Sequence, residues 1–182
     1  MLPLSVSGEC RLRALEESDA PELYALIDRN RAHLAPWMSW AAKQDVDATV
    51  AFIDRARSQF DENDGLQAAV IVADHIIGVV GFHAINWTHR STSIGYWLDE
   101  QHEGRGTITS CVNALVDHAL SDWKLNRIEI RVAPENTRSR AIPQRLGFRE
   151  EGTLRQAELV GERYLDSVVY SLLASDRRPA RT

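Results

Sequence analysis

The segment with the strongest chemical signal joins a strand-like run to a helix-like run near the middle of the chain. Residues 94–98 (IGYWL) are followed by Asp99 and Glu100, and then by QHEGRGT, which carries Gly104 and Gly106 directly before a helical pattern. The first N–H groups of a helix have no partner within the helix, and the positive end of the helix dipole lies there, so this terminus favours phosphate oxygens. Glycine before the helix lets the backbone approach such a ligand closely. The sequence therefore predicts an anion site in this turn.

A Gly-x-Gly pair is weak evidence by itself, because many turns before helices contain glycine for steric reasons. Two nucleotide-binding motifs are excluded. A dinucleotide fingerprint needs a third glycine where Thr109 stands, and no Gly-Lys-Ser/Thr follows as it does in a P-loop. A phosphate ligand at this turn must therefore belong to another class.

A second block of polar residues lies one predicted strand downstream. It comprises residues 136–139 (NTRS) and, after a short helical stretch, residues 145–148 (RLGF). Together with QHEGRG, which matches the Q/R-x-x-G-x-G/A signature, this block resembles the motifs of the GNAT superfamily of N-acetyltransferases. The run 95–170, including YWLDE and the later YLD, is similar to the Rim-type branch, which acts on protein N-terminal amines.

The resemblance implies that acetyl-CoA is the cofactor, and it implies where the cofactor binds. The pyrophosphate is expected at the glycine turn. The pantetheine arm is expected between two splayed parallel strands, whose free backbone edges would bind it like an added strand. The cofactor-binding residues implied in this way are Leu98, Gln101, Gly104, Arg105, Gly106, Thr107, Val132 and Asn136.

Acetyl transfer to an amine needs one group that takes the amine proton and another that protonates the departing thiolate. The resemblance implies Glu100, which closes YWLDE, as the base and Ser139 as the acid. Glu103 and Asp99 are alternative bases that would act through a water molecule. Many members of the superfamily place an acid tyrosine where this chain has Pro143, so that acid is excluded here.

The acceptor class follows from amine basicity together with the resemblance. An α-amine with a pKa of about 7.8 is roughly a tenth neutral at pH 7, whereas a lysine with a pKa of about 10.4 is much harder to deprotonate. A modest carboxylate base therefore suits the N-terminal α-amine of a protein, such as a ribosomal protein. A small amine, such as an antibiotic or a polyamine, is the alternative acceptor, and a non-catalytic acyl-CoA-binding protein is the alternative class. Trp37 and Trp40 lie where the family builds its acceptor wall, with core packing as their alternative role.

Hydrophobic periodicity predicts the elements that carry these motifs. Ser18 is the expected N-cap of the first helix. The expected elements are a strand at 10–15, helices at 18–30 and 45–63, strands at 66–73, 76–82 and 92–98, a helix at 107–122, a strand at 127–132, a helix at 137–146, and strands at 151–160 and 164–173. This β-α-α-β-β-β-α-β-α-β-β order predicts one α/β (α+β) domain over residues 1–174, followed by a polar tail over 175–182. The resemblance implies a mixed, mostly antiparallel sheet with helices on both faces.

Composition limits the partners. With 21 Lys and Arg against 26 Asp and Glu, the net charge of -5 lacks the basic field that non-specific nucleic-acid binding requires. No run of 18 apolar residues and no signal-peptide pattern are present, so we expect a cytoplasmic protein that does not act at a membrane. Cys10 and Cys111 are expected to be buried free thiols, and the six histidines lack metal-ligand spacing, so no metal is expected. Members of the family are often dimers, and the sequence leaves a homodimer open.

Overall fold

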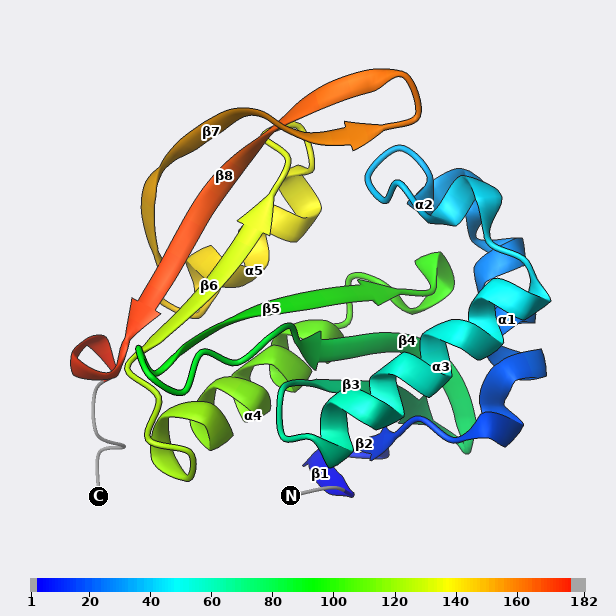
Figure 1. Cartoon of the computed structure of the whole chain (residues 1–182), viewed down its shortest axis with the longest axis horizontal. Coiled ribbons are helices and arrows are strands. Elements are labelled where there is room, and N and C mark those ends of the chain that lie inside the picture. The colour runs from blue at the N-terminus through cyan, green and yellow to red at the C-terminus, as the bar shows by residue number, and fades with distance from the viewer. Residues whose placement is uncertain (1–2, 178–182) are drawn as a thin grey trace.

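A computed structural model describes residues 3–177, which contain one eight-stranded sheet in the order β1-β2-β3-β4-β5-β6-β8-β7 (Figure 1). All neighbouring strands are antiparallel except β5 and β6, which are parallel. The strands are β1 (Leu4–Ser7), β2 (Cys10–Ala14), β3 (Leu66–Val72), β4 (His75–Phe82), β5 (Ser91–Leu98), β6 (Arg127–Val132), β7 (Arg149–Val160) and β8 (Arg163–Leu173). The predicted mixed and mostly antiparallel sheet is confirmed.

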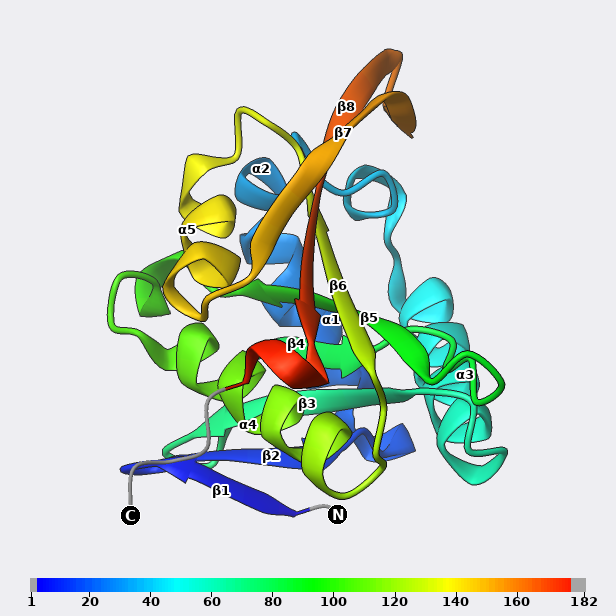
Figure 2. The same cartoon turned by 90° about the vertical axis from the view of Figure 1, so that its left-hand side faces the viewer.

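Residues 3–177 contain five α-helices, and four of them cover the two faces of this sheet. The five helices are α1 (Ala20–Arg29), α2 (Arg31–Leu34), α3 (Val46–Asp61), α4 (Thr107–Ser121) and α5 (Thr137–Arg145). Helices α1 and α3 pack on one face, and α4 and α5 on the other (Figure 2). Helices on both faces were predicted, and this is confirmed.

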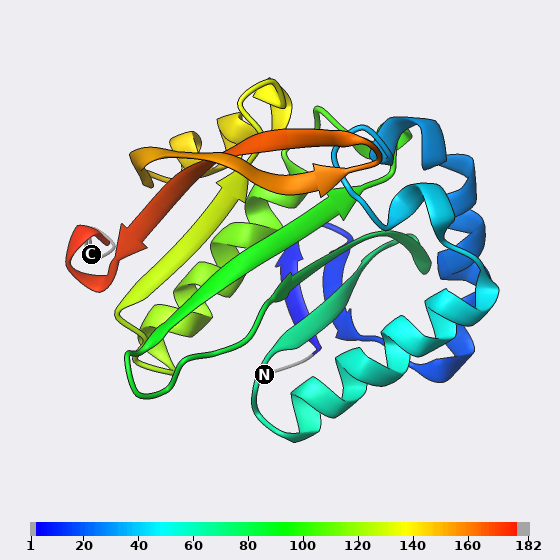
Figure 3. The ribbon, with the colours of Figure 1, turned by 45° about the horizontal axis from the view of Figure 1, so that its top comes forward.

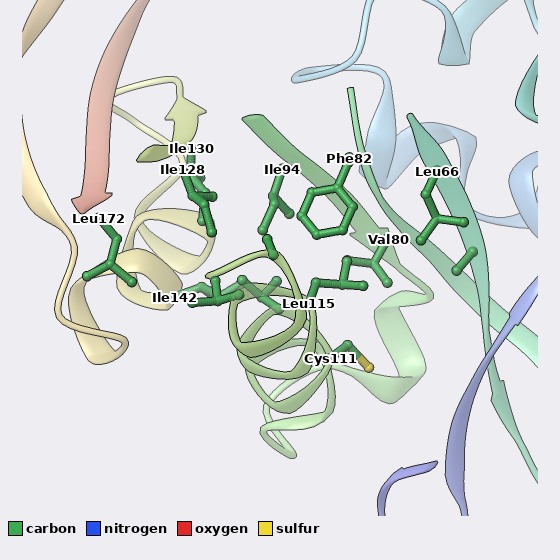
Figure 4. Close-up of a cluster of buried hydrophobic side chains, with 14 of the residues drawn as sticks. Leu66, Val80, Phe82, Ile94, Cys111, Leu115, Ile128, Ile130, Ile142 and Leu172 are labelled. Carbon is green, nitrogen blue, oxygen red and sulfur yellow. The ribbon is translucent and has the colours of Figure 1, made fainter. Parts of the chain in front are cut away.

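Each face of the sheet has its own hydrophobic core, because side chains along a strand alternate between the faces. Figure 4 shows part of the core on the α4 side, where Leu115 lies among Val80, Ile94 and Ile128. Helix α4 buries residues at steps of three and four, which is the pattern that predicted it. Cys10 and Cys111 are buried free cysteines in this core, as predicted. Their sulfur atoms are 3.7 Å apart, a proximity that the sequence did not indicate.

Some boundaries differ from the predictions at the N-terminal end. Strand β1 was not predicted, because it has only four residues and pairs with a single neighbour, β2. The proposed Ser18 cap is wrong. A short 3-10 turn, Glu17–Asp19, precedes α1 and makes Asp19 the N-cap residue. The Asp19 carboxylate instead accepts hydrogen bonds from Arg13 and from the backbone of Glu16.

The end of the described chain packs back onto α4. A 3-10 turn, Ala174–Asp176, follows β8, and Arg177 then pairs with Asp117 and donates to Asn113 Oδ1 at 2.9 Å. These contacts fall within the first residues of the polar tail that was predicted to begin at 175. Residues 178–182 of that tail lie outside the described residues.

The feature of the sheet that matters most for function is the divergence of β5 and β6 (Figure 3). These two strands pair only from Ser91 and Arg127 to Ser93 and Glu129. Beyond that point β5 continues along β4 as far as Leu98, while β6 continues along β8 to its own end. The two facing edges therefore separate, as the prediction of splayed parallel strands required.

Candidate active site

The turn before α4 has the geometry of an anion site. Gly104 and Gly106 have φ angles of 74° and 78°, a left-handed conformation that strongly favours glycine. Gly106 is the N-cap of α4, and no side chain among residues 3–177 accepts a hydrogen bond from this helix end. An added Cβ would meet nothing within 4 Å at either glycine, so glycine is required here by backbone conformation and not by crowding. The first N–H groups of α4 are thus available to an external acceptor.

The other polar residues predicted for this turn lie around it. Gln101 and Arg105 are exposed, and Arg105 Nη2 donates to the carbonyl oxygen of Gln101 at 3.2 Å. Thr107 is the first residue of α4. The structure therefore brings together, in one exposed turn, the five residues predicted to bind the pyrophosphate.

The free strand edges lie next to this turn. Leu98 ends β5 and is paired on one side with Gly78 of β4, while Val132 ends β6 and is paired on one side with Val168 of β8. Within residues 3–177 no strand pairs with the other side of either residue. Asn136 is the N-cap of α5, and its Oδ1 accepts from Ser139 N at 3.1 Å, which leaves its amide nitrogen available to a ligand.

Three carboxylates at the end of β5 are candidate bases, and their surroundings differ. Asp99 is almost fully buried and accepts hydrogen bonds from Arg29 Nη2 at 2.8 Å and His102 Nδ1 at 3.2 Å. Burial opposes its ionisation, but the hydrogen bonds and the charge of Arg29 outweigh burial and hold the pKa of Asp99 below its usual value. Such a carboxylate is a poor base, and its role is to hold Arg29 and His102 in place through hydrogen bonds.

Both oxygens of the Glu103 carboxylate are also paired, and they link two helices. Its Oε1 is 2.9 Å from His33 Nε2, and its Oε2 accepts from Arg138 Nη1 at 2.7 Å. His33 belongs to α2 and Arg138 to the first turn of α5, so the Glu103 side chain ties both helices to the glycine turn.

Glu100 differs from both neighbours. Its backbone N–H donates to Asn30 Oδ1 at 3.0 Å, and Asn30 is itself buried. Its side chain is 64% exposed, its Oε1 lies 3.9 Å from His33 Nδ1, and no residue in the range 3–177 donates a hydrogen bond to it. The structure therefore anchors the backbone of Glu100 and leaves its carboxylate available.

Ser139 lies in the first turn of α5 and is held through three of its atoms. Its N–H donates to Asn136, its Oγ donates to the hydroxyl of Tyr96 at 3.2 Å, and that hydroxyl donates to the Ser139 carbonyl oxygen at 3.1 Å. Sequence reasoning did not assign Tyr96 a role. Tyr96 lies two residues before Leu98 and therefore on the same face of β5, and this spacing could have indicated that it lies near the site.

The two tryptophans expected at the acceptor wall differ in what they contact. The Trp40 ring lies 6.1 Å from the Trp97 ring at an angle of 56°, and Trp40 is 37% exposed. Trp97 belongs to β5 and faces the α1 and α3 side, opposite to Tyr96. Trp37 lies in the turn after α2, where its backbone N–H donates to the carbonyl oxygen of Leu34. Trp40 thus stands beside the free end of β5.

Among residues 3–177 no three His, Cys, Asp or Glu side chains gather as a metal ion would require. None of the helices described here is long and apolar enough to cross a membrane.

Comparison with known proteins identifies the family. The model of an acetyltransferase (GNAT) domain matches residues 10–149, which include both motifs. The chain belongs to the GNAT acetyltransferase family. It is therefore an acyltransferase that uses acetyl-CoA, as the sequence predicted.

Individual relatives agree with this assignment. YdaF of Bacillus subtilis (strain 168), described as a candidate ribosomal N-acetyltransferase, is 33% identical over 95% of this chain and 96% of its own. The ribosomal-protein-serine acetyltransferase of Escherichia coli (strain K12) is 30% identical over 92% of this chain and 94% of its own. The structure of the microcin C7 self-immunity acetyltransferase MccE with acetyl-CoA and AMP superposes with a TM-score of 0.89 at 29% identity, covering 94% of this chain and 96% of that one. The resemblance to ribosomal-protein acetyltransferases is thus confirmed.

The geometry fits what a GNAT enzyme needs from acetyl-CoA. The cofactor supplies an acetyl group bonded to a sulfur atom, a thiolate being the leaving group. The open helix end at Gly106 suits its phosphates, and the unpaired edges at Leu98 and Val132 suit the amide groups of an extended arm. Glu100 follows directly after β5, and Ser139 lies on α5 after β6, so the two flank the splay.

Removing the charge of Asp99 is expected to destabilise this GNAT domain. Because its pKa is held below the ordinary value of about 3.9, ionised Asp99 adds stability above that pH, and this stability is lost as the pH falls through the folded-state pKa. Asp99→Asn should lower the free energy of unfolding by about 3 kcal/mol at pH 7, and the difference should shrink as the pH falls from 7 through the folded-state pKa of Asp99. Urea unfolding of both proteins across this pH range measures the difference.

Asp74→Asn is the control, since Asp74 is 83% exposed in its pair with Arg11. A gap that does not change with pH would contradict the argument.

Proposed function

We propose that this GNAT enzyme acetylates the N-terminal α-amine of a protein, and that its acceptor is a ribosomal protein in the cytoplasm. The observation that carries the proposal is the exposed carboxylate of Glu100 at the end of β5, which lies 3.9 Å from His33, whereas Asp99 and Glu103 are held in close ion pairs of 2.7 to 2.9 Å. A weak base of this kind suffices for an α-amine with a pKa of about 7.8. The names of the two curated relatives support a ribosomal-protein acceptor.

In the proposed reaction Glu100 takes the proton of the incoming ammonium, directly or through one water molecule. Ser139 donates its hydroxyl proton to the departing sulfur from the other side of the splay. Asn136 orients Ser139 and binds the cofactor through its amide nitrogen, while Trp37 and Trp40 form the wall against which the acceptor packs. Gln101, Arg105 and Thr107 complete the pyrophosphate site with the two glycines.

The acceptor is tested by mass spectrometry after incubation with acetyl-CoA. The panel holds peptides with free N-termini from ribosomal proteins, the same peptides with blocked N-termini and a free lysine, and small amines such as polyamines. Acetylation confined to the free N-termini is the expected result. Acetylation of the small amines in preference to every peptide would replace this proposal with the small-amine function, and MccE shows that this fold also serves a self-immunity acetyltransferase.

Ser139→Ala is expected to lower kcat by about ten- to a hundredfold while leaving the affinity for acetyl-CoA nearly unchanged. The reason is that the hydroxyl acts mainly on the charge that develops on sulfur, and a thiol pKa of about 8.5 makes the thiolate a fair leaving group even without help. Steady-state kinetics and calorimetry with acetyl-CoA separate the two effects. A loss of cofactor affinity alone would make Ser139 a binding residue.

A further inference from the structure

The Tyr96 side chain crosses from β5 to α5 beneath the splay. Tyr96 belongs to the part of β5 beyond Ser93 that has no pairing with β6, and its ring packs against the core on the α4 side. Its hydroxyl meets both the Oγ and the carbonyl oxygen of Ser139, at 3.2 and 3.1 Å. This is a direct link between the diverging strand and the first turn of α5.

The directions of these two hydrogen bonds matter. Ser139 Oγ donates to the Tyr96 hydroxyl oxygen, and the Tyr96 hydroxyl donates to the Ser139 carbonyl oxygen. The Ser139 proton therefore points at Tyr96. To reach a sulfur atom in the splay, that proton has to turn away from Tyr96, and Oγ then lacks a donor on this side.

We propose that Tyr96 is a positioning residue for leaving-group protonation, which orients Ser139 and donates a hydrogen bond to its Oγ when the Ser139 proton turns to sulfur. This inference rests on the proposed acid role of Ser139. The Tyr96 hydroxyl needs only to rotate from the carbonyl oxygen to Oγ, since it already lies within hydrogen-bond distance of both atoms.

The proton balance follows from the same geometry. The acceptor nitrogen forms a bond to the acetyl carbon, and the bond between that carbon and sulfur breaks with its electron pair on sulfur. Ser139 passes its proton to sulfur, and Oγ takes back, through solvent, the proton that the amine releases on forming the amide. Tyr96 keeps its own proton throughout. Burial raises the pKa of Tyr96 to about 12, so its hydroxyl stays protonated at neutral pH and remains a hydrogen-bond donor. Its hydrogen bond stabilises the negative charge that develops on Oγ.

Tyr170 provides a matched control on the same side of the sheet. It is a second tyrosine of this core, in β8, and is 1% exposed. Its hydroxyl donates to Glu150 Oε2 at 3.0 Å and accepts from Arg140 Nε at 2.9 Å, with no bond to Ser139. Removing this hydroxyl perturbs the core in a similar way without touching the proposed acid.

The first experiment compares Tyr96→Phe, Tyr170→Phe, Ser139→Ala and the double variant Tyr96→Phe/Ser139→Ala in full-length protein. We expect Tyr96→Phe to lower kcat by about five- to tenfold, the effect of one hydrogen bond, with acetyl-CoA affinity and melting temperature close to those of Tyr170→Phe. The double variant should be no slower than Ser139→Ala by more than about twofold, because Tyr96 acts through Ser139.

The second readout needs no acceptor. The pKa of the thiol of bound coenzyme A is followed through the ultraviolet absorbance of the thiolate. Tyr96→Phe and Ser139→Ala should both raise this pKa relative to wild type, whereas Tyr170→Phe should leave it unchanged, a pattern that a packing role would not produce.

The outcomes separate this inference from the proposed acceptor. An unchanged kcat in Tyr96→Phe, an unchanged thiol pKa, or a loss of kcat that only parallels a loss of stability or cofactor affinity each overturns the role of Tyr96. If the thiol pKa responds as expected but the wild type acetylates no peptide N-terminus, the acceptor proposal fails and the role of Tyr96 stands.

Discussion

Gly106→Val is expected to weaken the binding of acetyl-CoA by at least about a hundredfold. A β-branched side chain disfavours the left-handed conformation that Gly106 adopts at φ 78°, so the turn must move to relieve the strain. In the proposed site, the first N–H groups of α4 would then no longer point at the pyrophosphate, and the loss of two or three charge-assisted hydrogen bonds accounts for an effect of this size. Calorimetric titration with coenzyme A measures the affinity directly.

A control must separate the loss of the site from backbone strain in general. Gly8, in the turn between β1 and β2, has a φ of 54°, and an added Cβ would likewise meet nothing within 4 Å. Gly8→Val therefore introduces comparable strain in a turn that has no part in the proposed site, and it should bind coenzyme A as the wild type does. A folded Gly106→Val protein with wild-type affinity would show that the pyrophosphate does not bind at this turn.

The fold was largely predictable because its signals are local. Polar and apolar residues alternate along 127–132, and apolar residues recur at steps of three and four along α4. Both patterns depend only on residues close in sequence, and the structure confirms both elements. The unpredicted β1 shows the limit, since four residues at an edge carry too little periodicity to be distinguished from a loop. The splay depended on the family resemblance, because sequence periodicity does not reveal which strands become neighbours.

The site was less predictable, because the properties of its carboxylates depend on distant residues. The resemblance implied Glu100 as the base, but the sequence does not show which of Asp99, Glu100 and Glu103 is paired in the fold. Their partners Arg29 and His33 lie 70 positions away, and these contacts bury one carboxylate and occupy another. Only the assembled fold shows that Glu100 is left available. The Tyr96 contact with Ser139 spans 43 positions and was missed for the same reason.

Glu100→Gln is expected to lower kcat/KM by at least about a hundredfold near pH 6 and to have little effect near pH 9. Glutamine preserves size and hydrogen bonding but removes the basic carboxylate, so the variant depends on acceptor that is already neutral. With an α-amine pKa of about 7.8, that fraction is small at the lower pH and nearly complete at the higher one. The ratio of wild-type to variant kcat/KM with one peptide acceptor should therefore fall steadily with rising pH.

Glu103→Gln is the matched control. It removes a neighbouring carboxylate that is paired with His33 and Arg138, and its effect should be a constant ratio across this range, as loss of positioning produces. A constant ratio for Glu100→Gln together with a pH-dependent ratio for Glu103→Gln would assign the base to Glu103. Removing the carboxylate that accepts the proton slows the reaction only at a pH where the amine is charged.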